Sequence, residues 1–206
     1  MIVPTIISND TTDLYERCKE LGKYSNTLHL DIMDGVFVKN KSIWFDEFYL
    51  TMHKKYEAHL MVDDPEGWVY RTINNLDRII VNIERVKDVP KLITRIKRTK
   101  QEIGFSLNPE TSIDKIKPYL NDLDCVLILT VNPGQYGAPF IPECLDKVKA
   151  LREIYSKDIE VDGSVNPFTI KSCKDAGANI FAVGSYIQNS PDKAAAIKHL
   201  ESILGQ

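Results

Sequence analysis

The chain has 206 residues, of which 43% are hydrophobic and 27% are charged, and its net charge is −3. This length suits one hydrophobic core and is short for two full-sized domains, so we expect a single domain over residues 1–206. Basic residues are spread along the whole chain, which argues against nucleic acid as a partner. No apolar run is long enough to span a membrane and the N-terminus lacks a signal-peptide layout, which argues against a membrane partner.

Short β-branched runs alternate with longer amphipathic stretches from one end of the chain to the other. The predicted strands are Ile2–Ile7, Thr27–Asp31, Tyr56–Met61, Arg78–Glu84, Glu102–Asn108, Cys125–Val131, Asp158–Asp162 and Ile180–Gly184. Helical patterns lie between them, for example at Thr11–Lys23, Asp88–Thr99, Ser112–Leu120, Pro142–Tyr155 and Pro167–Ala176. Strands that alternate with helices form parallel βαβ units, and eight such units predict a single (β/α)8 barrel of the TIM-barrel class. A doubly wound open sheet is the structural alternative, because it has the same local pattern.

Three of the predicted strands are followed by turn-forming residues and then by a helical pattern. These turns are Asn108-Pro109, Asn132-Pro133-Gly134 and Asp162-Gly163. In a barrel, such loops lie at the carboxyl ends of the strands, where catalytic and binding residues gather.

The stretch from His29 to Gly35 carries the strongest chemical signal in the sequence. Because side chains alternate across a strand, His29, Asp31 and Met33 share one face, and the intervening apolar residues share the other. The apolar face suits the helices outside a barrel, so we expect the polar face to point into the interior. A His and an Asp buried there need partners, since burial of an unpaired polar group is costly.

Two further strands bring side chains of the same kind to the same end of the barrel. His59 and Met61 share a face at the end of one strand, and Glu160 and Asp162 share a face at the end of another. Two His and two carboxylates form a mixed ligand set that suits Zn, Mn, Fe(II) or Co better than Ca or Mg. For any single residue, a hydrogen-bonded core His paired with a structural Asp is an equal alternative. Their matching depth in three strands favours a metal site.

The last two strand-to-helix loops predict a phosphate site. Gly163-Ser164 and Gly184-Ser185 each place small residues shortly before a helix, where backbone N–H groups can hold an anion; helix capping is the alternative. The segment Val131–Gly137 contains Gly134 and Gly137, and we expect it to form a lid over the pocket, with an ordinary long loop as the alternative.

The remaining Cys and His residues are expected to play no chemical role. Cys18, Cys125, Cys144 and Cys173 are widely scattered and form no CxxC pair, which favours reduced thiols in a cytoplasmic protein. His53 and His199 lie in polar, helix-like contexts and are expected at the surface.

The motifs of this chain resemble those of the ribulose-phosphate 3-epimerase family. The matching segments follow one another through almost the whole sequence: Thr5-Ile6-Ile7-Ser8, His29–Gly35 with Phe37-Val38, His59-Leu60-Met61, Leu107-Asn108-Pro109, Val131–Gly134 with Phe140-Ile141-Pro142, Glu160–Gly163, and Val183-Gly184-Ser185. The stretches His29–Gly35 and Val131–Gly134 are the most specific of these.

The resemblance implies a metal-dependent (β/α)8 barrel that forms a homo-oligomer. It implies one divalent ion, Zn, Fe(II), Mn or Co, bound by His29, Asp31, His59 and Asp162, with Asp31 and Asp162 also serving as the acid and base. The expected substrate-binding residues are Ser8, Met33, Met61, Gly134, Gly137, Gly163, Ser164, Gly184 and Ser185. The implied reaction interconverts ribulose 5-phosphate and xylulose 5-phosphate, as in the pentose phosphate pathway, and needs no redox or organic cofactor. Inversion requires a proton to leave one face and another to arrive on the opposite face, which two groups accomplish most simply.

Several positions depart from the family pattern, and they concern the rim of the pocket more than the ligands. They are Lys39, Asn82, Arg85, Leu129, Gln135-Tyr136, Ser164 and Tyr186. Because related allulose 6-phosphate 3-epimerases often carry a serine at the position of Ser164, allulose 6-phosphate is the alternative substrate. A non-catalytic sugar-phosphate-binding homologue is a further alternative, against which the intact ligand set argues. The decarboxylases and aldolases of similar barrels use Asp-x-Lys-x-x-Asp, whereas Met33 and Val36 stand here in place of the lysine and the second aspartate.

Overall fold

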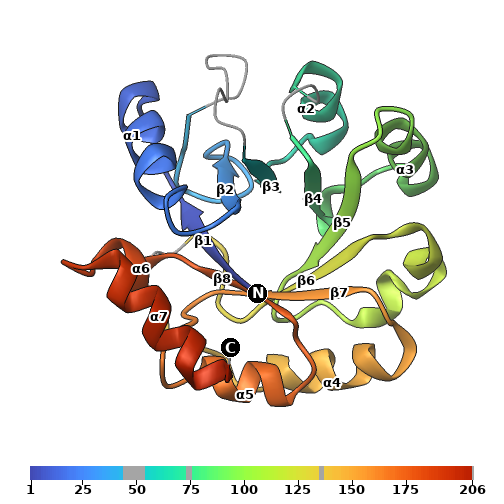
Figure 1. Ribbon diagram of the computed structural model, residues 1–206. Helices are drawn as coiled ribbons and strands as arrows, with labels where there is room; N and C mark the ends of the chain where they lie inside the picture. Colours follow the sequence, from blue (N-terminus) through green and yellow to red (C-terminus); the bar gives the residue numbers. More distant parts are fainter. Residues whose placement is uncertain (44–53, 73–75, 135–136, 206) are drawn as a thin grey trace.

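The barrel is closed, and its strands follow one another around it in chain order. The computed structural model describes residues 1–43, 54–72, 76–134 and 137–205. All neighbouring strands pair in parallel, and β1 pairs with β8 to complete the circle (Figure 1). The strands are β1 Ile2–Ile6, β2 Thr27–Met33, β3 Lys55–Met61, β4 Arg78–Asn82, β5 Glu102–Leu107, β6 Cys125–Leu129, β7 Asp158–Asp162 and β8 Ile180–Val183. The prediction of a (β/α)8 barrel is confirmed, and the open sheet is excluded.

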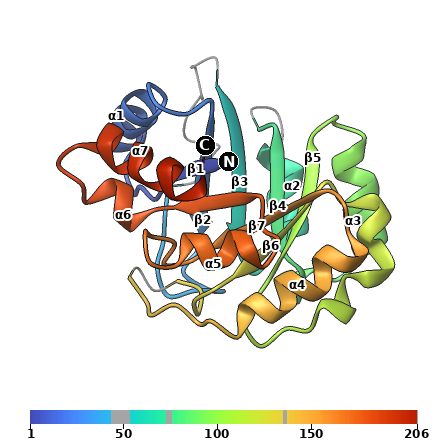
Figure 2. The ribbon, with the colours of Figure 1, turned by 60° about the horizontal axis from the view of Figure 1, so that its bottom comes forward.

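Helical segments lie between most consecutive strands and surround the barrel, and the described part of the connection from β2 to β3 contains none (Figures 1 and 2). The α-helices are α1 Thr11–Leu21, α2 Pro65–Thr72, α3 Val89–Lys97, α4 Cys144–Ile154, α5 Ile170–Asp175, α6 Ser185–Gln188 and α7 Lys193–Leu204. Short 3-10 helices are η3 Ile83–Arg85, η4 Ile113–Lys115 and η5 Lys117–Asp122. Among the described residues, no helix combines the length and apolar character needed to cross a bilayer.

The predicted strands all occur, and their ends differ from prediction by at most two residues. The predicted helix at Ser112–Leu120 is wrong, because two 3-10 helices, η4 and η5, lie there instead. Pro118 accounts for the difference: proline has no N–H to donate and its ring disfavours an α conformation at Lys117.

The two faces of each strand pack in different environments. Leu28, Leu30 and Ile32 of β2 belong to the large apolar core between the barrel and its helices. Their neighbours His29 and Asp31 are buried inside the barrel, as the alternation predicted. Smaller apolar groups also lie inside, among them Ile80, Leu127 and Leu129. The alternation of side chains therefore places an apolar core between the strands and the helices, and it places the polar side chains of β2 inside the barrel.

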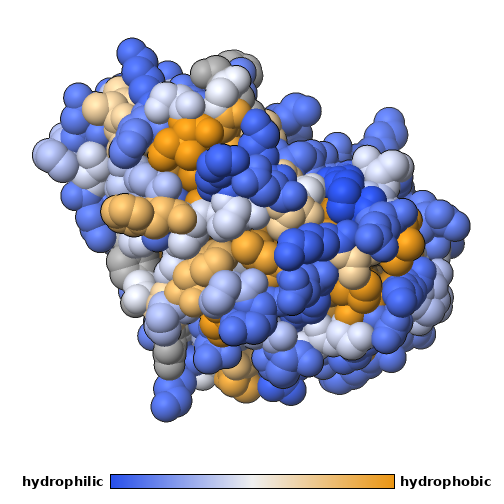
Figure 3. Space-filling model, turned by 90° about the horizontal axis from the view of Figure 1, so that it is seen from below, coloured by the Kyte–Doolittle hydropathy of each residue, from blue (hydrophilic) through white to orange (hydrophobic). Residues whose placement is uncertain are grey.

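The outer surface and the cysteines agree with the sequence analysis. Seen from below, over α4 and α5, the surface mixes hydrophilic and hydrophobic side chains, as expected for the solvent side of amphipathic helices (Figure 3). Cys18, Cys125, Cys144 and Cys173 are buried free thiols. His199 is exposed and contacts the Tyr186 hydroxyl at 2.9 Å, whereas His53 lies outside the described residues.

Candidate metal centre and substrate pocket

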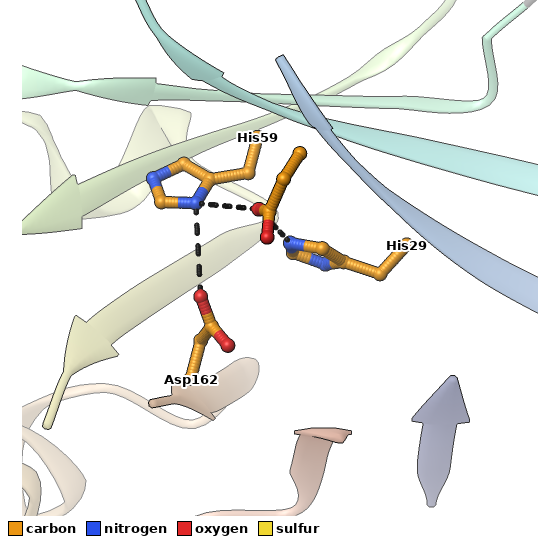
Figure 4. A group of neighbouring side chains, drawn as sticks. His29, His59 and Asp162 are labelled. Atoms are coloured by element: carbon orange, nitrogen blue, oxygen red, sulfur yellow. Dashed lines mark ion pairs between the residues drawn. The ribbon is translucent and has the colours of Figure 1, made fainter. Parts of the chain in front are cut away.

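Four side chains from three strands converge inside the barrel, near the carboxyl ends of the strands. His29 and Asp31 come from β2, His59 from β3 and Asp162 from β7, and the register places Asp31 level with His59. Asp31 Oδ1 lies 3.3 Å from His29 Nε2 and 3.4 Å from His59 Nδ1. Asp162 Oδ2 lies 3.9 Å from His59 Nδ1, and Figure 4 shows the side chains of His29, His59 and Asp162 pointing toward one another. One ligand-type atom of each residue lies within 4.8 Å of the others.

Each histidine is oriented by a hydrogen bond at the nitrogen that points away from this cluster. His29 Nδ1 lies 2.9 Å from Glu57 Oε1, and His59 Nε2 lies 3.1 Å from Asn82 Oδ1 and 3.0 Å from Ser106 Oγ. The Asn82 amide nitrogen donates to Asn108 at 3.2 Å, so the Asn82 oxygen is the atom that accepts from His59. A neutral ring that donates its outer N–H presents a lone pair at its inner nitrogen, which is the usual arrangement of metal-binding histidines.

The inner atoms of the cluster fit a divalent cation. His29 Nε2, His59 Nδ1 and Asp31 Oδ1 are buried, and none has a hydrogen-bond partner among the described residues. Buried polar atoms without partners are rare because desolvation makes them costly. A cation between them would satisfy all three, and two imidazoles with two carboxylates are ligands typical of Zn, Mn, Fe(II) or Co.

The two aspartates have opposite electrostatic environments. Burial alone would raise the pKa of Asp31, but the neighbouring His29 and His59 hold that pKa well below its usual range. Burial, together with the negative charge of Asp31, raises the pKa of Asp162 to about 6. Paired carboxyl groups whose pKa values are pushed apart are typical of an acid and a base in one site.

A layer of charged side chains lies beneath the cluster, inside the barrel. Glu57 and Glu160 approach His29 Nδ1 to 2.9 and 3.1 Å, and Arg78 lies 3.4 Å from Glu57 and 2.7 Å from Asp158. Burial and the charge of Glu57 raise the pKa of Glu160 to about 8. The inward position of Glu160 agrees with prediction. Glu57 was not predicted to lie inside, although it lies two residues before His59 and therefore shares its face.

A cavity of about 930 Å³ opens over this cluster, and Asp31 and Asp162 form part of its lining. The cavity is lined by eight of the predicted substrate-binding residues: Met33, Met61, Gly134, Gly137, Gly163, Ser164, Gly184 and Ser185. Ser8 is the exception, because its hydroxyl lies 2.6 Å from Asp13 Oδ2 at the start of α1 and the residue does not line the cavity. A role of Ser8 in binding substrate stays a prediction.

The loop after β7 requires a glycine at its first position. Gly163 has a φ of +112°, and a Cβ there would lie 2.6 Å from Val131 Cγ2. Ser164 also has a positive φ, and its hydroxyl donates to the carbonyl of Ala138 in the preceding strand-to-helix connection. The loops after β6 and β7 are thus packed together at the mouth of the cavity.

The positions that depart from the family pattern fall into two groups. Leu129 and Ser164 line the cavity, and Asn82 orients His59 behind it. Lys39 is exposed, Arg85 lies 3.2 Å from Asp63 and over the ring of Phe37, and Tyr186 contacts His199. These last three do not line the cavity. Gln135 and Tyr136, the middle of the predicted lid, lie outside the described residues.

The fold and the site define a class of protein, a (β/α)8 barrel with a buried His/Asp cluster of metal-ligand type below a cavity at the carboxyl ends of the strands. The model of the ribulose-phosphate 3 epimerase family matches residues 1–188. The chain belongs to this family, whose curated members are named as epimerases, isomerases that act on carbohydrates.

Curated relatives match over nearly their whole length. A ribulose-phosphate 3-epimerase of Schizosaccharomyces pombe is 30% identical over 98% of this chain and 92% of that protein. A ribulose-phosphate 3-epimerase of Synechocystis is 34% identical over 96% of this chain and 91% of that protein. The cytoplasmic isoform of Oryza sativa is 36% identical over 97% of this chain and 92% of that protein.

Solved structures of low sequence identity share the fold. A crystal structure of KGPDC from Streptococcus mutans superposes with a TM-score of 0.74 at 15% identity, covering 99% of this chain and 96% of that chain. A 3-hexulose-6-phosphate synthase from Salmonella typhimurium superposes with a TM-score of 0.71 at 14% identity, covering 100% and 98%. At such identities the likeness shows the barrel alone.

Proposed function

We propose that this chain interconverts ribulose 5-phosphate and xylulose 5-phosphate. The observation that carries the proposal is the buried cluster of His29, Asp31, His59 and Asp162, which lies beneath a cavity in a chain of the ribulose-phosphate 3-epimerase family. The names of the curated relatives support this substrate.

Asp31 and Asp162 are the proposed acid and base. They belong to β2 and β7, and both line the cavity, so a substrate between them would have one carboxyl group on each side of the reacting carbon. In one direction the first removes the proton next to the ketone, and the second delivers a proton to the opposite face; the roles exchange in the reverse reaction. The low pKa of Asp31 and the raised pKa of Asp162 mean that Asp162 takes up a proton more readily than Asp31, which supports unlike roles for the two groups.

His29, Asp31, His59 and Asp162 would hold the divalent ion. When bound, such an ion supplies positive charge beside the oxygens on which negative charge develops as the proton leaves. The outer hydrogen bonds of His29 and His59 keep the ligating nitrogens turned inward. In this arrangement, Asp31 and Asp162 combine the roles of ligand and proton carrier.

The rest of the cavity lining would hold the substrate. Met33, Met61 and Leu129 offer apolar surface that excludes water without competing for hydrogen bonds. Backbone groups of the loops after β7 and β8 would bind the phosphate, and Gly134 and Gly137 belong to the proposed lid, Val131–Gly137. The proposed phosphate-binding residues are Gly163, Ser164, Gly184 and Ser185.

The decisive experiment compares kcat/KM for ribulose 5-phosphate and allulose 6-phosphate with the metal-loaded protein. We expect a preference for the pentose of at least about a hundredfold, roughly 2.7 kcal/mol in transition-state binding. Comparable values for both sugars would contradict the assignment of a pentose enzyme. An absence of turnover on both, with metal bound, would favour a non-catalytic sugar-phosphate-binding protein.

We also propose that the chain forms a homo-oligomer in the cytoplasm, where its four buried thiols stay reduced. Light scattering coupled to size exclusion tests the assembly, and a monomer throughout the micromolar range would contradict it.

A further inference from the structure

Arg17 on α1 lines the cavity beside the loop that follows β8. Its Nη1 donates to Gln188 Oε1 at 3.0 Å, although 171 residues separate the two in sequence. Gln188 belongs to α6, which begins at Ser185, and α1 and α6 lie on the same side of the barrel (Figures 1 and 2). Arg17 therefore brings a permanent positive charge close to one of the two loops proposed to bind phosphate.

A chain of hydrogen bonds holds the guanidinium of Arg17 in place. Ser8 Oγ lies 2.6 Å from Asp13 Oδ2, and Arg17 Nε donates to the same oxygen at 2.8 Å. On the other side, Gln188 accepts from Arg17 and donates through Nε2 to the carbonyl of Thr5 at 3.0 Å. These hydrogen bonds use Nε and Nη1, and within the described ranges 1–43, 54–72, 76–134 and 137–205 no hydrogen bond or ion pair involves Nη2. The side chain is 36% exposed, so its free edge can meet a ligand.

The charges of the cavity create a need for such a cation. Asp31 and Asp162 contribute carboxyl groups to the lining, and the chain as a whole carries a net charge of −3. A phosphate monoester is close to a dianion at neutral pH, so both features oppose its entry. Among the described residues that line the cavity, the cationic side chains are Arg17 and Lys41, and Arg17 is the one that contacts α6.

We propose that Arg17 binds the substrate phosphate through its guanidinium, with Ser8, Asp13 and Gln188 as positioning residues. This inference rests on the proposed function in one respect, namely that the ligand is a phosphorylated ketose whose phosphate lies by the β8–α6 loop. It adds a charged side chain to a site otherwise built from backbone groups, and it gives Ser8 an indirect role in place of a direct contact. The contact is charge-assisted, and its preorganised geometry reduces the entropy lost on binding.

A purely structural role, in which Arg17 only joins α1 to α6, predicts different kinetics. Loss of a structural contact would lower the melting temperature and affect all substrates alike. Loss of a phosphate contact would raise KM for phosphorylated substrates and leave an unphosphorylated ketose unaffected.

The test uses Arg17→Met, which keeps an unbranched apolar side chain and removes the guanidinium, and Arg17→Lys, which keeps the charge. Lys149→Met is the matched control, because Lys149 also pairs with an aspartate on its own helix, Asp146, and lies outside the cavity. KM and kcat are measured for ribulose 5-phosphate, kcat/KM for D-ribulose, and the Kd of inorganic phosphate by calorimetry. We expect Arg17→Met to raise KM and the phosphate Kd about tenfold with kcat changed less than about twofold. Arg17→Lys should recover much of this loss, and D-ribulose turnover should be unchanged.

The outcomes separate this inference from the proposed function. If the wild type epimerises ribulose 5-phosphate but Arg17→Met leaves KM and the phosphate Kd unchanged, Arg17 is no phosphate ligand and the proposed function stands. If the wild type has no epimerase activity but Arg17→Met still weakens phosphate binding about tenfold, the phosphate site stands and the proposed function fails. Equal losses with D-ribulose and the phosphorylated ketose, together with a lowered melting temperature, would overturn the inference in favour of a structural role.

Discussion

Replacing Asn82 tests whether the histidines are held ready for a metal ion. Asn82 is fully buried, its oxygen accepts from His59 Nε2 at 3.1 Å, and its nitrogen donates to Asn108. Asn82→Leu keeps the branched shape and removes both hydrogen bonds. Among the described residues, the outer nitrogen of His59 then keeps one contact, with Ser106 Oγ at 3.0 Å.

The size of the effect follows from these contacts. One hydrogen bond of this kind contributes about 1 kcal/mol, and a donor left partly unsatisfied in a buried site costs about 1–3 kcal/mol. Because Ser106 can still accept, we expect the lower end of this range, about 1.4 kcal/mol, which corresponds to a tenfold weaker metal affinity.

The assay is a competition for zinc between the protein and a chelator of known affinity. Asn26→Leu is the control: Asn26 is exposed and contacts Lys54, so its loss should leave the metal affinity unchanged. Circular dichroism and melting temperature verify that both variants fold. A folded Asn82→Leu protein with a zinc Kd within twofold of wild type would refute the idea that Asn82 orients a ligand.

Three further predictions concern the metal, the phosphate and the acid/base pair. Chelation should abolish epimerase activity, with recovery on adding Zn, Mn, Fe(II) or Co, and full turnover by rigorously metal-free protein would contradict the metal site. Ser185→Asp places a carboxylate in the proposed phosphate loop, so steady-state kinetics should give at least a roughly tenfold higher KM at constant metal content; an unchanged KM would place the phosphate elsewhere. Asp162→Asn should lower kcat by about 10²–10⁴, because Asn cannot carry the proton. In deuterated water, Asp162→Asn should exchange the hydrogen of one epimer of the substrate, and Asp31→Asn should exchange that of the opposite epimer. Exchange of the same epimer by both variants would point to a single base.

Much of the barrel and its polar interior could be predicted from local patterns. In the strand that contains His29–Met33, side chains alternate between the inner and outer faces of the barrel. This assignment does not depend on which strands lie beside it. Eight such runs separated by helical patterns leave few topologies, since parallel strands need crossover connections. Helix type was less predictable: Pro118 converts a helical pattern into 3-10 turns.

The partners of these side chains depend on contacts across the barrel. Whether His59 bonds Asn82, and whether Arg78 reaches Asp158, depends on the register and tilt of strands that are distant in sequence. Ser8 matched the family pattern, yet its hydroxyl faces Asp13, and Arg17 meets Gln188 because closure of the barrel brings the first helix beside the loop of the last strand. Strand periodicity depends on a few consecutive residues, so it can be predicted from the sequence. A hydrogen-bond partner depends on the three-dimensional packing of the whole barrel, so it cannot be predicted from the sequence alone.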